Sequence, residues 1–240
     1  MALRPNAHIL PVDWATIISA LSETAPTLFF KKFYESCITD PQAPLGGLCY
    51  VALDFETTGF DLANDSIVSI GLVPFDLQRI YCRNAQYWLV KQDGPLAESS
   101  VLVHGITHGQ LDSAGDLGTI IKLMLGSLGG RMVIAHYHHI ERQFLQEGAR
   151  RCYDEAIQFP IIDTMLIEEA VNKRRGKTLH RLFHKPENPS LRLPDCRKYY
   201  GLPVYRQHHA LTDAIATAEL FQAQVAHHFS KQTPISDLWV

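Results

Sequence analysis

The segment Tyr50-Val51-Ala52-Leu53-Asp54-Phe55-Glu56-Thr57-Thr58-Gly59 carries the clearest structural signal in this sequence. It begins as an apolar run, which is typical of a buried strand, and it ends in a glycine turn. Side chains two residues apart share a face of a strand, so we expect Asp54 and Glu56 to point the same way, with Phe55 opposite. Two such carboxylates repel each other, and a divalent cation would offset the repulsion. The alternative is a strand end whose acids simply face water.

The composition fits one globular domain, or a domain with an extension. The chain has 240 residues, of which 46% are hydrophobic and 20% charged, with a net charge of −3. This balance offers no global basic field for nucleic acid, which argues only weakly against nucleic-acid binding, because bound cations reverse the local sign of an acid cluster. Five widely spaced cysteines predict reduced thiols in a cytoplasmic protein. The apolar runs predict neither a membrane span nor a signal peptide, and hence no membrane partner.

Residues 1–47 differ in pattern from the rest of the chain. Apolar side chains recur there at helical spacing in two groups, Trp14, Ile17, Ile18 and Leu21, and then Leu28, Phe29, Phe33 and Tyr34. Residues 39–47 have the composition of a linker. We therefore expect a helical N-terminal extension over residues 1–47, a main domain over 48–230 and a C-terminal tail over 231–240. The aromatic face of the extension should pack on the main domain, or alternatively on a partner.

From residue 48 the pattern changes to strands. Segments 48–55, 66–75 and 80–90 predict an antiparallel meander, and short apolar segments at 132–135 and 161–163 predict two more strands. Helices are expected between and after them, at 117–128, 140–149, 164–171, 191–199 and 209–229, with a basic loop at 173–177. Strands that alternate with helices in this way indicate an α/β domain with a mixed sheet.

Two further segments combine acids with histidines. The first is Ala135-His136-Tyr137-His138-His139-Ile140-Glu141, in which a short strand leads into a helix that holds Glu141 near its start. The second is His208-His209-Ala210-Leu211-Thr212-Asp213-Ala214-Ile215-Ala216-Thr217-Ala218. Its helix should hold Asp213 one turn in and leave His208 on the preceding turn, while His209 faces solvent or the helix flank. The alanines allow this helix to lie close to a sheet.

These three segments, in this order, resemble the DEDDh branch of the DnaQ-like 3′–5′ exonucleases, in the ribonuclease H-like superfamily. The resemblance covers residues 48–229, and Val103-His104-Gly105-Ile106-Thr107 and Ile162-Asp163-Thr164 also match family stretches. It implies a ribonuclease H-like fold, with a mixed five-stranded sheet flanked by helices. The DEDDh exonuclease domain would then be the main domain, residues 48–230.

The resemblance also implies a catalytic site with two divalent ions, Mg²⁺ or Mn²⁺. The four acids that would hold the ions are Asp54, Glu56, Glu141 and Asp213, and His208 would take a proton from the attacking water. Two ions roughly 4 Å apart can hold both the attacking and the leaving oxygen at phosphorus. The product would be a nucleoside 5′-monophosphate. Residues implied at the terminal nucleotide are Thr57, Thr58, Phe60, His104 and Ile106.

The middle motif departs from the family pattern, which usually has His-Asn-x-x-Phe-Asp. Here Tyr137 replaces the asparagine, Ile140 the phenylalanine and Glu141 the aspartate. Glutamate keeps the charge but is longer by one methylene. It could ligate a metal directly with a shifted backbone or through water, or the metal position could be weakened.

The leading hypothesis is a 3′–5′ exonuclease that acts on single-stranded or frayed DNA ends. The alternatives are an exoribonuclease of the same fold and a non-catalytic nucleic-acid-binding relative. Residues 1–47 could recruit a polymerase or another protein, in which case their deletion should spare catalysis. A basic group, Lys173, Arg174, Arg175, Lys177, Arg181 and Lys185, could contact phosphates or be a solvated helix end. We expect Tyr87 to serve in strand packing rather than base stacking.

Overall fold

The computed structural model describes residues 3, 5–6, 12–92, 94, 105–111, 113–175 and 189–240. Its centre is a five-stranded sheet with the strand order β3-β2-β1-β4-β5. The strands are β1 (Tyr50–Thr57), β2 (Ile67–Phe75), β3 (Gln86–Leu89), β4 (Met132–Ala135) and β5 (Ile161–Asp163). The pairs β1–β2 and β2–β3 are antiparallel, whereas β1–β4 and β4–β5 are parallel, so the predicted mixed sheet is confirmed.

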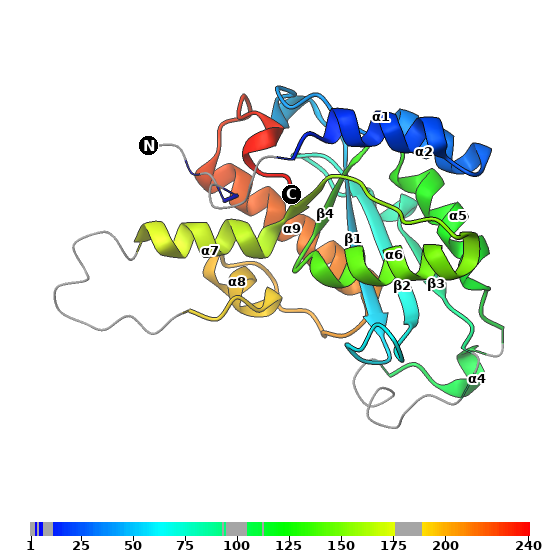
Figure 1. The fold of residues 1–240 in the computed structure, drawn as a ribbon. Coiled ribbons are helices and arrows are strands. Elements are labelled where there is room, and N and C mark those ends of the chain that lie inside the picture. The colour runs from blue at the N-terminus through cyan, green and yellow to red at the C-terminus, as the bar shows by residue number, and fades with distance from the viewer. Residues whose placement is uncertain are drawn as a thin grey trace.

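Helices cover both faces of this sheet. They are α1 (Trp14–Thr24), α2 (Leu28–Ser36), α4 (His108–Leu111), α5 (Leu117–Leu128), α6 (His139–Tyr153), α7 (Thr164–Arg175), α8 (Leu193–Tyr199) and α9 (Ala210–His228). Figure 1 shows α6 in front of the strands and the long α9 behind them. α7 and α8 pack beside α9, while α1, α2 and α5 lie on the side of α6. No helix in the described ranges is long and apolar enough to cross a membrane.

An aromatic cluster joins α9 to the sheet. The ring of Tyr50 on β1 lies 5.3 Å from that of Phe75 on β2 and 5.1 Å from that of Phe221 on α9. All three side chains are fully buried, and the Tyr50 hydroxyl donates a hydrogen bond to the Leu45 carbonyl at 2.6 Å. The hydroxyl therefore has a hydrogen-bond partner inside the core, so its burial does not carry the free-energy penalty of an unpaired polar group.

The N-terminal helices pack on the main domain, as the sequence predicted. Phe30 of α2 lies 5.4 Å from the ring of Tyr153 on α6, and Phe33 lies 5.5 Å from Phe159. Phe30 and Phe33, together with Trp14 from α1, belong to the same buried cluster as the sheet residues. The aromatic face of residues 1–47 is thus already covered within the chain.

Residues 231–240, predicted as a tail, also pack against the sheet. Trp239 forms a bridge with Ile162 of β5, and Val240 exchanges two backbone hydrogen bonds with Ile161, at 2.8 and 3.3 Å. Arg142 of α6 donates a hydrogen bond to the Val240 carbonyl at 2.8 Å. This segment therefore forms part of the edge of the sheet beside β5.

Two sequence expectations were wrong in extent. The third strand was expected over 80–90 but covers only Gln86–Leu89, because Asp76 accepts hydrogen bonds from Gln78, Arg79 and Tyr81 and stabilises a turn there. α7 continues to Arg175, so the first three residues of the expected basic loop lie in its last turn. Cations are favourable at that end of a helix, and Lys173 also pairs with Glu169 one turn earlier at 2.7 Å.

Candidate active site

Two acids of the candidate site come from the end of β1. Asp54 pairs with Gly71 of β2 and Glu56 pairs with Ser69, and the regular register is interrupted immediately after Glu56. Both carboxylates consequently lie on one face of the sheet, at the end of its central strand. This is the position that the alternating pattern of the sequence predicted for them.

The third acid comes from the first turn of α9, which lies on the same face. His209 caps this helix, since its Nδ1 atom accepts a hydrogen bond from the Thr212 backbone N–H at 3.4 Å. The helix can approach the sheet closely because the residue beneath it is Gly71, where a Cβ atom would lie 2.2 Å from the Leu211 nitrogen. As a result, ligand oxygens of Asp54, Glu56 and Asp213 all lie within 4.8 Å of one another.

Glu141 lies beside this group rather than in it. It is in the first turn of α6, is 3% exposed, and falls outside the set of three acids whose oxygens are within 4.8 Å. Its Oε2 atom is buried and has no hydrogen-bond partner among the described residues. A buried carboxylate oxygen without a donor is costly, and a bound cation would satisfy it.

The pKa values of the four acids also indicate a cation site. Burial raises the pKa of Asp54 well above its usual range, and the charges of Glu141, Asp213 and Glu56 add to the effect. Burial and the charge of Asp213 raise the pKa of Glu56 to about 7. Burial is also the main cause that raises the pKa of Glu141 to about 8 and that raises the pKa of Asp213. Four crowded carboxyl groups that resist ionisation form a site suited to divalent cations.

His208 precedes this helix on an exposed turn, as expected. Its backbone has the left-handed value φ = 65°, and its N–H donates a hydrogen bond to Oδ2 of Asp213 at 2.8 Å. The turn is thereby fixed to one of the acids, while the imidazole is left exposed to solvent. The imidazole is therefore accessible to water and to a substrate that enters beside the acid cluster.

Sequence reasoning missed a stack between Tyr87 and His209. The two rings lie 4.6 Å apart at an interplanar angle of 16°. Tyr87 is opposite Gly71 in the β2–β3 register, which brings its ring next to the start of α9. Beyond the two aromatic residue types, the sequence carried no signal for this contact, because it depends on pairing between distant strands.

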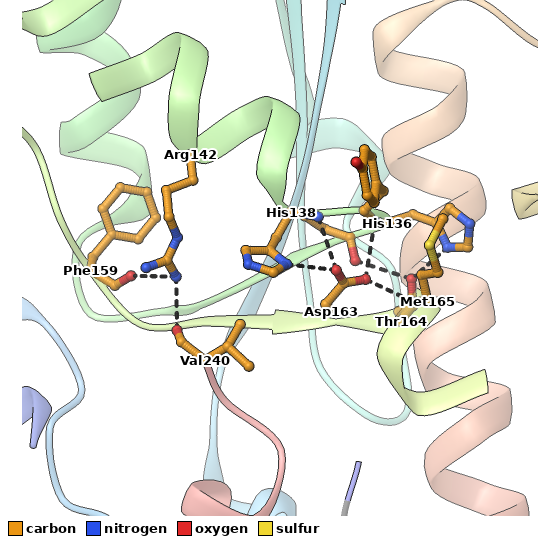
Figure 2. Close-up of polar contacts among 10 residues, drawn as sticks. His136, His138, Arg142, Phe159, Asp163, Thr164, Met165 and Val240 are labelled. Atoms are coloured by element: carbon orange, nitrogen blue, oxygen red, sulfur yellow. Dashed lines mark hydrogen bonds and ion pairs between the residues drawn. The ribbon is translucent and has the colours of Figure 1, made fainter. Parts of the chain in front are cut away.

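A buried network fixes the turn between β4 and α6. The carboxylate of Asp163, at the end of β5, accepts hydrogen bonds from the backbone N–H groups of Tyr137 and His138 at 3.0 Å each, and the Nδ1 of His138 lies 2.7 Å from it. Figure 2 shows the contacts between His138 and Asp163. Burial alone would raise the pKa of Asp163, but the hydrogen bond and the charge of His138 lower it more, so the pKa of Asp163 lies below its usual range. Tyr137 has φ = 71°, so these hydrogen bonds hold a strained residue just before the helix of Glu141.

The other histidine of this segment serves the same region. His136 has Nδ1 at 2.9 Å from the Thr164 hydroxyl and Nε2 at 2.9 Å from the Leu191 carbonyl. Both ring nitrogens are therefore engaged in hydrogen bonds that link the residue after β4 to α7 and to the segment that precedes α8. This supports a structural role for the histidine rather than metal ligation.

The structure describes four of the five residues that were predicted near the terminal nucleotide. The Thr57 hydroxyl donates to the Gly59 carbonyl at 2.7 Å and that of Thr58 to Asp65 at 2.6 Å, so both stabilise the turn after β1. Phe60 follows with 82% of its surface exposed. Ile106 is buried in a small cluster with Val68 and Leu111. His104 lies outside the described residues, as do Lys177, Arg181 and Lys185 of the basic group.

Comparison with known proteins identifies the family. The model of the RNase_T family, described as exonuclease, matches residues 51–221. The chain belongs to this exonuclease family. The match confirms the DnaQ-like assignment made from the sequence motifs.

Relatives of this exonuclease include bacterial proteins named as DNA polymerase III or as a subunit of it. It is 27% identical over 181 residues to the DNA polymerase III subunit epsilon of Treponema pallidum, covering 75% of this chain and 78% of that protein. It is 28% identical over 176 residues to the PolC-type DNA polymerase III of Thermotoga maritima, but the match covers 73% of this chain and only 12% of that much longer protein.

Solved structures share the fold of this exonuclease. E. coli Exonuclease I in complex with a dT13 oligonucleotide matches with a TM-score of 0.60 at 18% identity, over 75% of this chain and 41% of that one. The nuclease domain of 3′hExo, a DEDDh family member bound to rAMP, matches with a TM-score of 0.58 at 15% identity, over 74% of this chain and 92% of that one. The predicted ribonuclease H-like fold is therefore confirmed.

Proposed function

We propose that this exonuclease removes nucleotides from the 3′ end of single-stranded or frayed DNA and releases nucleoside 5′-monophosphates. The observation that carries the proposal is the gathering of Asp54, Glu56 and Asp213 within 4.8 Å, with Glu141 beside them. These acids come from distant parts of the chain, and their ionisation is opposed by burial and by one another. Such a cluster lowers stability unless bound cations offset the repulsion, which supports a cation-dependent function.

The four acids fit a pair of divalent ions, Mg²⁺ or Mn²⁺. Asp54, Glu56 and Asp213 would supply the central oxygen ligands, and Glu141 would supply its unpartnered Oε2. Carboxylate oxygens are the ligands that these hard cations prefer. When bound, the ions would supply positive charge that stabilises the attacking and leaving oxygens at phosphorus.

His208 would act as the general base. Its turn is anchored to Asp213 through the backbone, and the exposed ring would accept a proton from the attacking water at a ring nitrogen. Phe60, exposed after β1, would contact the terminal base, while the hydrogen bonds of Thr57 and Thr58 hold the turn that presents it.

The comparisons favour DNA as the substrate. Several relatives are named as DNA polymerase III proteins, and one structural neighbour is bound to a dT13 oligonucleotide. The neighbour bound to rAMP supports the alternative, an exoribonuclease. The choice depends on whether the site accepts a 2′-hydroxyl group.

Matched single-stranded DNA and RNA, labelled at the 5′ end, test the proposal. We expect DNA to shorten stepwise from its 3′ end with Mg²⁺ or Mn²⁺ and to stay intact with EDTA. The Asp213→Asn variant, which keeps the shape of the side chain, should be inactive. Faster shortening of RNA would favour the exoribonuclease, and binding of a folded protein without hydrolysis would favour a non-catalytic relative.

A polymerase partner remains a proposal for residues 1–47. Their aromatic face is covered by the core, so a partner would have to contact the outer surface of α1 and α2, where Leu28 is 67% exposed. Deletion of the extension would expose the core partners of Phe30 and Phe33, so we no longer expect a truncated chain to keep full activity. A Leu28→Glu substitution, tested for polymerase binding with hydrolysis as the control, is the better experiment.

A further inference from the structure

A cavity of about 180 Å³ lies between α8, the start of α9 and the segment that joins them. Its apolar wall comes from α8 and the joining segment, and consists of Leu193, Pro194, Leu202, Pro203 and Val204. Asp213 also lines this cavity, which therefore reaches the acid cluster of the candidate active site. The cavity is separate from Thr57, Thr58 and Phe60, none of which lines it.

One wall of the cavity is fixed by a buried arginine. The Arg197 guanidinium donates hydrogen bonds to the Ala216 carbonyl at 2.6 Å, the Pro203 carbonyl at 2.9 Å and the Glu219 carboxylate at 2.6 Å. The guanidinium carbon of Arg197 lies 4.7 Å from the centroid of the Tyr205 ring. The Tyr205 hydroxyl donates a hydrogen bond to the Glu219 carboxylate at 2.9 Å. Because these contacts join α8, α9 and the segment between them, the cavity is preformed.

Basic residues occur in and next to the lining of the cavity. Lys198 lines it, and Arg192 and Arg206 are adjacent in sequence to lining residues. All three side chains are exposed, and none of them has an ion pair with a carboxylate in the described part of the chain. Asp195 lies on the same helix but does not line the cavity. A ligand with an apolar ring and a negatively charged backbone would complement this surface.

We propose that this cavity is a subsite for one nucleobase of the strand, upstream of the phosphate that is cleaved. The inference rests on the proposed exonuclease function. The volume of about 180 Å³ is below the 300–1,000 Å³ typical of small-molecule sites, which suits a single ring system. Val204, an apolar side chain that is 90% exposed at the edge of the cavity, is positioned to contact the base, and Gln207 supplies an amide.

An abasic scan with a matched pair of variants tests the subsite. Single-stranded DNA oligonucleotides carry one abasic site, moved stepwise upstream from the 3′ end. The readouts are kcat/KM for release of the terminal nucleotide with Mg²⁺ and fluorescence anisotropy in EDTA. For the unmodified protein we expect an abasic site at one position to lower kcat/KM roughly tenfold, which is the magnitude of losing one base contact.

The variants identify the cavity as the place where that base binds. In Val204→Asp, an acid at the edge should repel the strand, and the position-specific abasic penalty should disappear. Leu123→Asp makes the same change at an exposed leucine of α5, on the other side of the sheet, and should keep the full penalty.

Two results would overturn the subsite. The first is a scan in which no single position stands out, and the second is a penalty of equal size in Val204→Asp and in the unmodified protein. Either result, obtained with an intact oligonucleotide that is hydrolysed normally, leaves the exonuclease function standing. Failure to hydrolyse the intact oligonucleotide would instead remove the proposed function, and the subsite with it.

Discussion

Glu141 differs from the other three acids in its surroundings. It is almost fully buried, its Oε2 has no partner among the described residues, and burial raises its pKa to about 8. Without a cation this side chain therefore remains largely protonated at neutral pH. The additional methylene relative to aspartate places its carboxylate on a longer arm from the first turn of α6, and it lies beside the tight group of three.

Substitution of Glu141 tests whether it completes the cation site. We expect Glu141→Gln to lower kcat/KM by about 100-fold, because the amide keeps the shape but cannot bind a cation as a charged ligand. Hydrolysis of labelled DNA at several Mn²⁺ concentrations gives the measurement. The control is Glu147→Gln on the same helix, where the carboxylate pairs with Arg150 and Arg151 at the surface. Equal rates for Glu141→Gln and the parent would mean that three acids suffice.

Tyr87 is the second residue whose role can be tested singly. Its ring stacks on His209 at 4.6 Å, and His209 caps the helix that follows His208. We expect Tyr87→Leu to lower kcat by about tenfold with little change in KM, since a small displacement of a catalytic group is costly. Tyr87→Phe keeps the stack and should keep the rate. If Tyr87→Phe were as slow as Tyr87→Leu, the hydroxyl rather than the stack would be the important feature.

At the level of elements, the close approach of α9 to β2 positions Asp213. This approach depends on Gly71, where a Cβ atom would lie 2.2 Å from the Leu211 nitrogen and 2.3 Å from the Ala210 carbonyl carbon. Both atoms belong to the backbone of the helix start, so neither can rotate away. The start of α9 and its acid would have to move to admit even one methyl group.

We therefore expect Gly71→Ala to destabilise the protein by about 1–3 kcal/mol, the usual range for overpacking. Activity should fall further than stability alone explains, because the displaced helix carries Asp213. Thermal unfolding and hydrolysis rates of the same preparation give both quantities. Gly126→Ala on α5 is the control, since a Cβ there meets nothing within 4 Å and should stabilise the helix by about 0.5–1 kcal/mol. Similar behaviour of the two variants would contradict the packing argument.

The elements that the sequence predicted best are those whose ends are defined by glycines or by the limits of a short apolar run. The helix at Leu117–Leu128 has the expected bounds, because Gly129 and Gly130 follow it directly. The strands at Met132–Ala135 and Ile161–Asp163 are short and fully buried, so their apolar runs define them. The segment 80–90 was overestimated because a side chain, that of Asp76, stabilises a turn that hydrophobic periodicity does not report.

For the whole molecule, local periodicity accounted for part of the site and tertiary pairing for the rest. Alternation along a strand correctly placed Asp54 and Glu56 on one face, and helical spacing placed Asp213 one turn into α9. The Tyr87–His209 stack follows from the register of β3 on β2, which no local pattern contains. The distance of Glu141 from the other acids likewise depends on how α6 meets the sheet.

The acid cluster predicts an unusual pH dependence of stability. Above about pH 4.5 both glutamates are largely ionised in the unfolded chain, whereas in the folded chain Glu56 ionises only as the pH passes about 7 and Glu141 only as it passes about 8. The folded state then binds more protons than the unfolded state. The free energy of unfolding should therefore fall as the pH rises from about 4.5 to about 8, in the absence of metal.

Divalent cations should reverse this loss of stability. Ionised carboxylates bind Mn²⁺ or Mg²⁺ in the folded state alone, so at about 100 times the dissociation constant the melting temperature at pH 8 should rise by about 5–10 °C. At pH 5 the rise should be much smaller, since protons compete with the cation for the same oxygens. Calorimetry with and without Mn²⁺ at both pH values measures the effect, and the Glu56→Gln/Asp213→Asn variant is the control that should not respond. A rise in melting temperature that is the same at pH 5 and pH 8, or that persists in this variant, would place the cation somewhere other than among these acids.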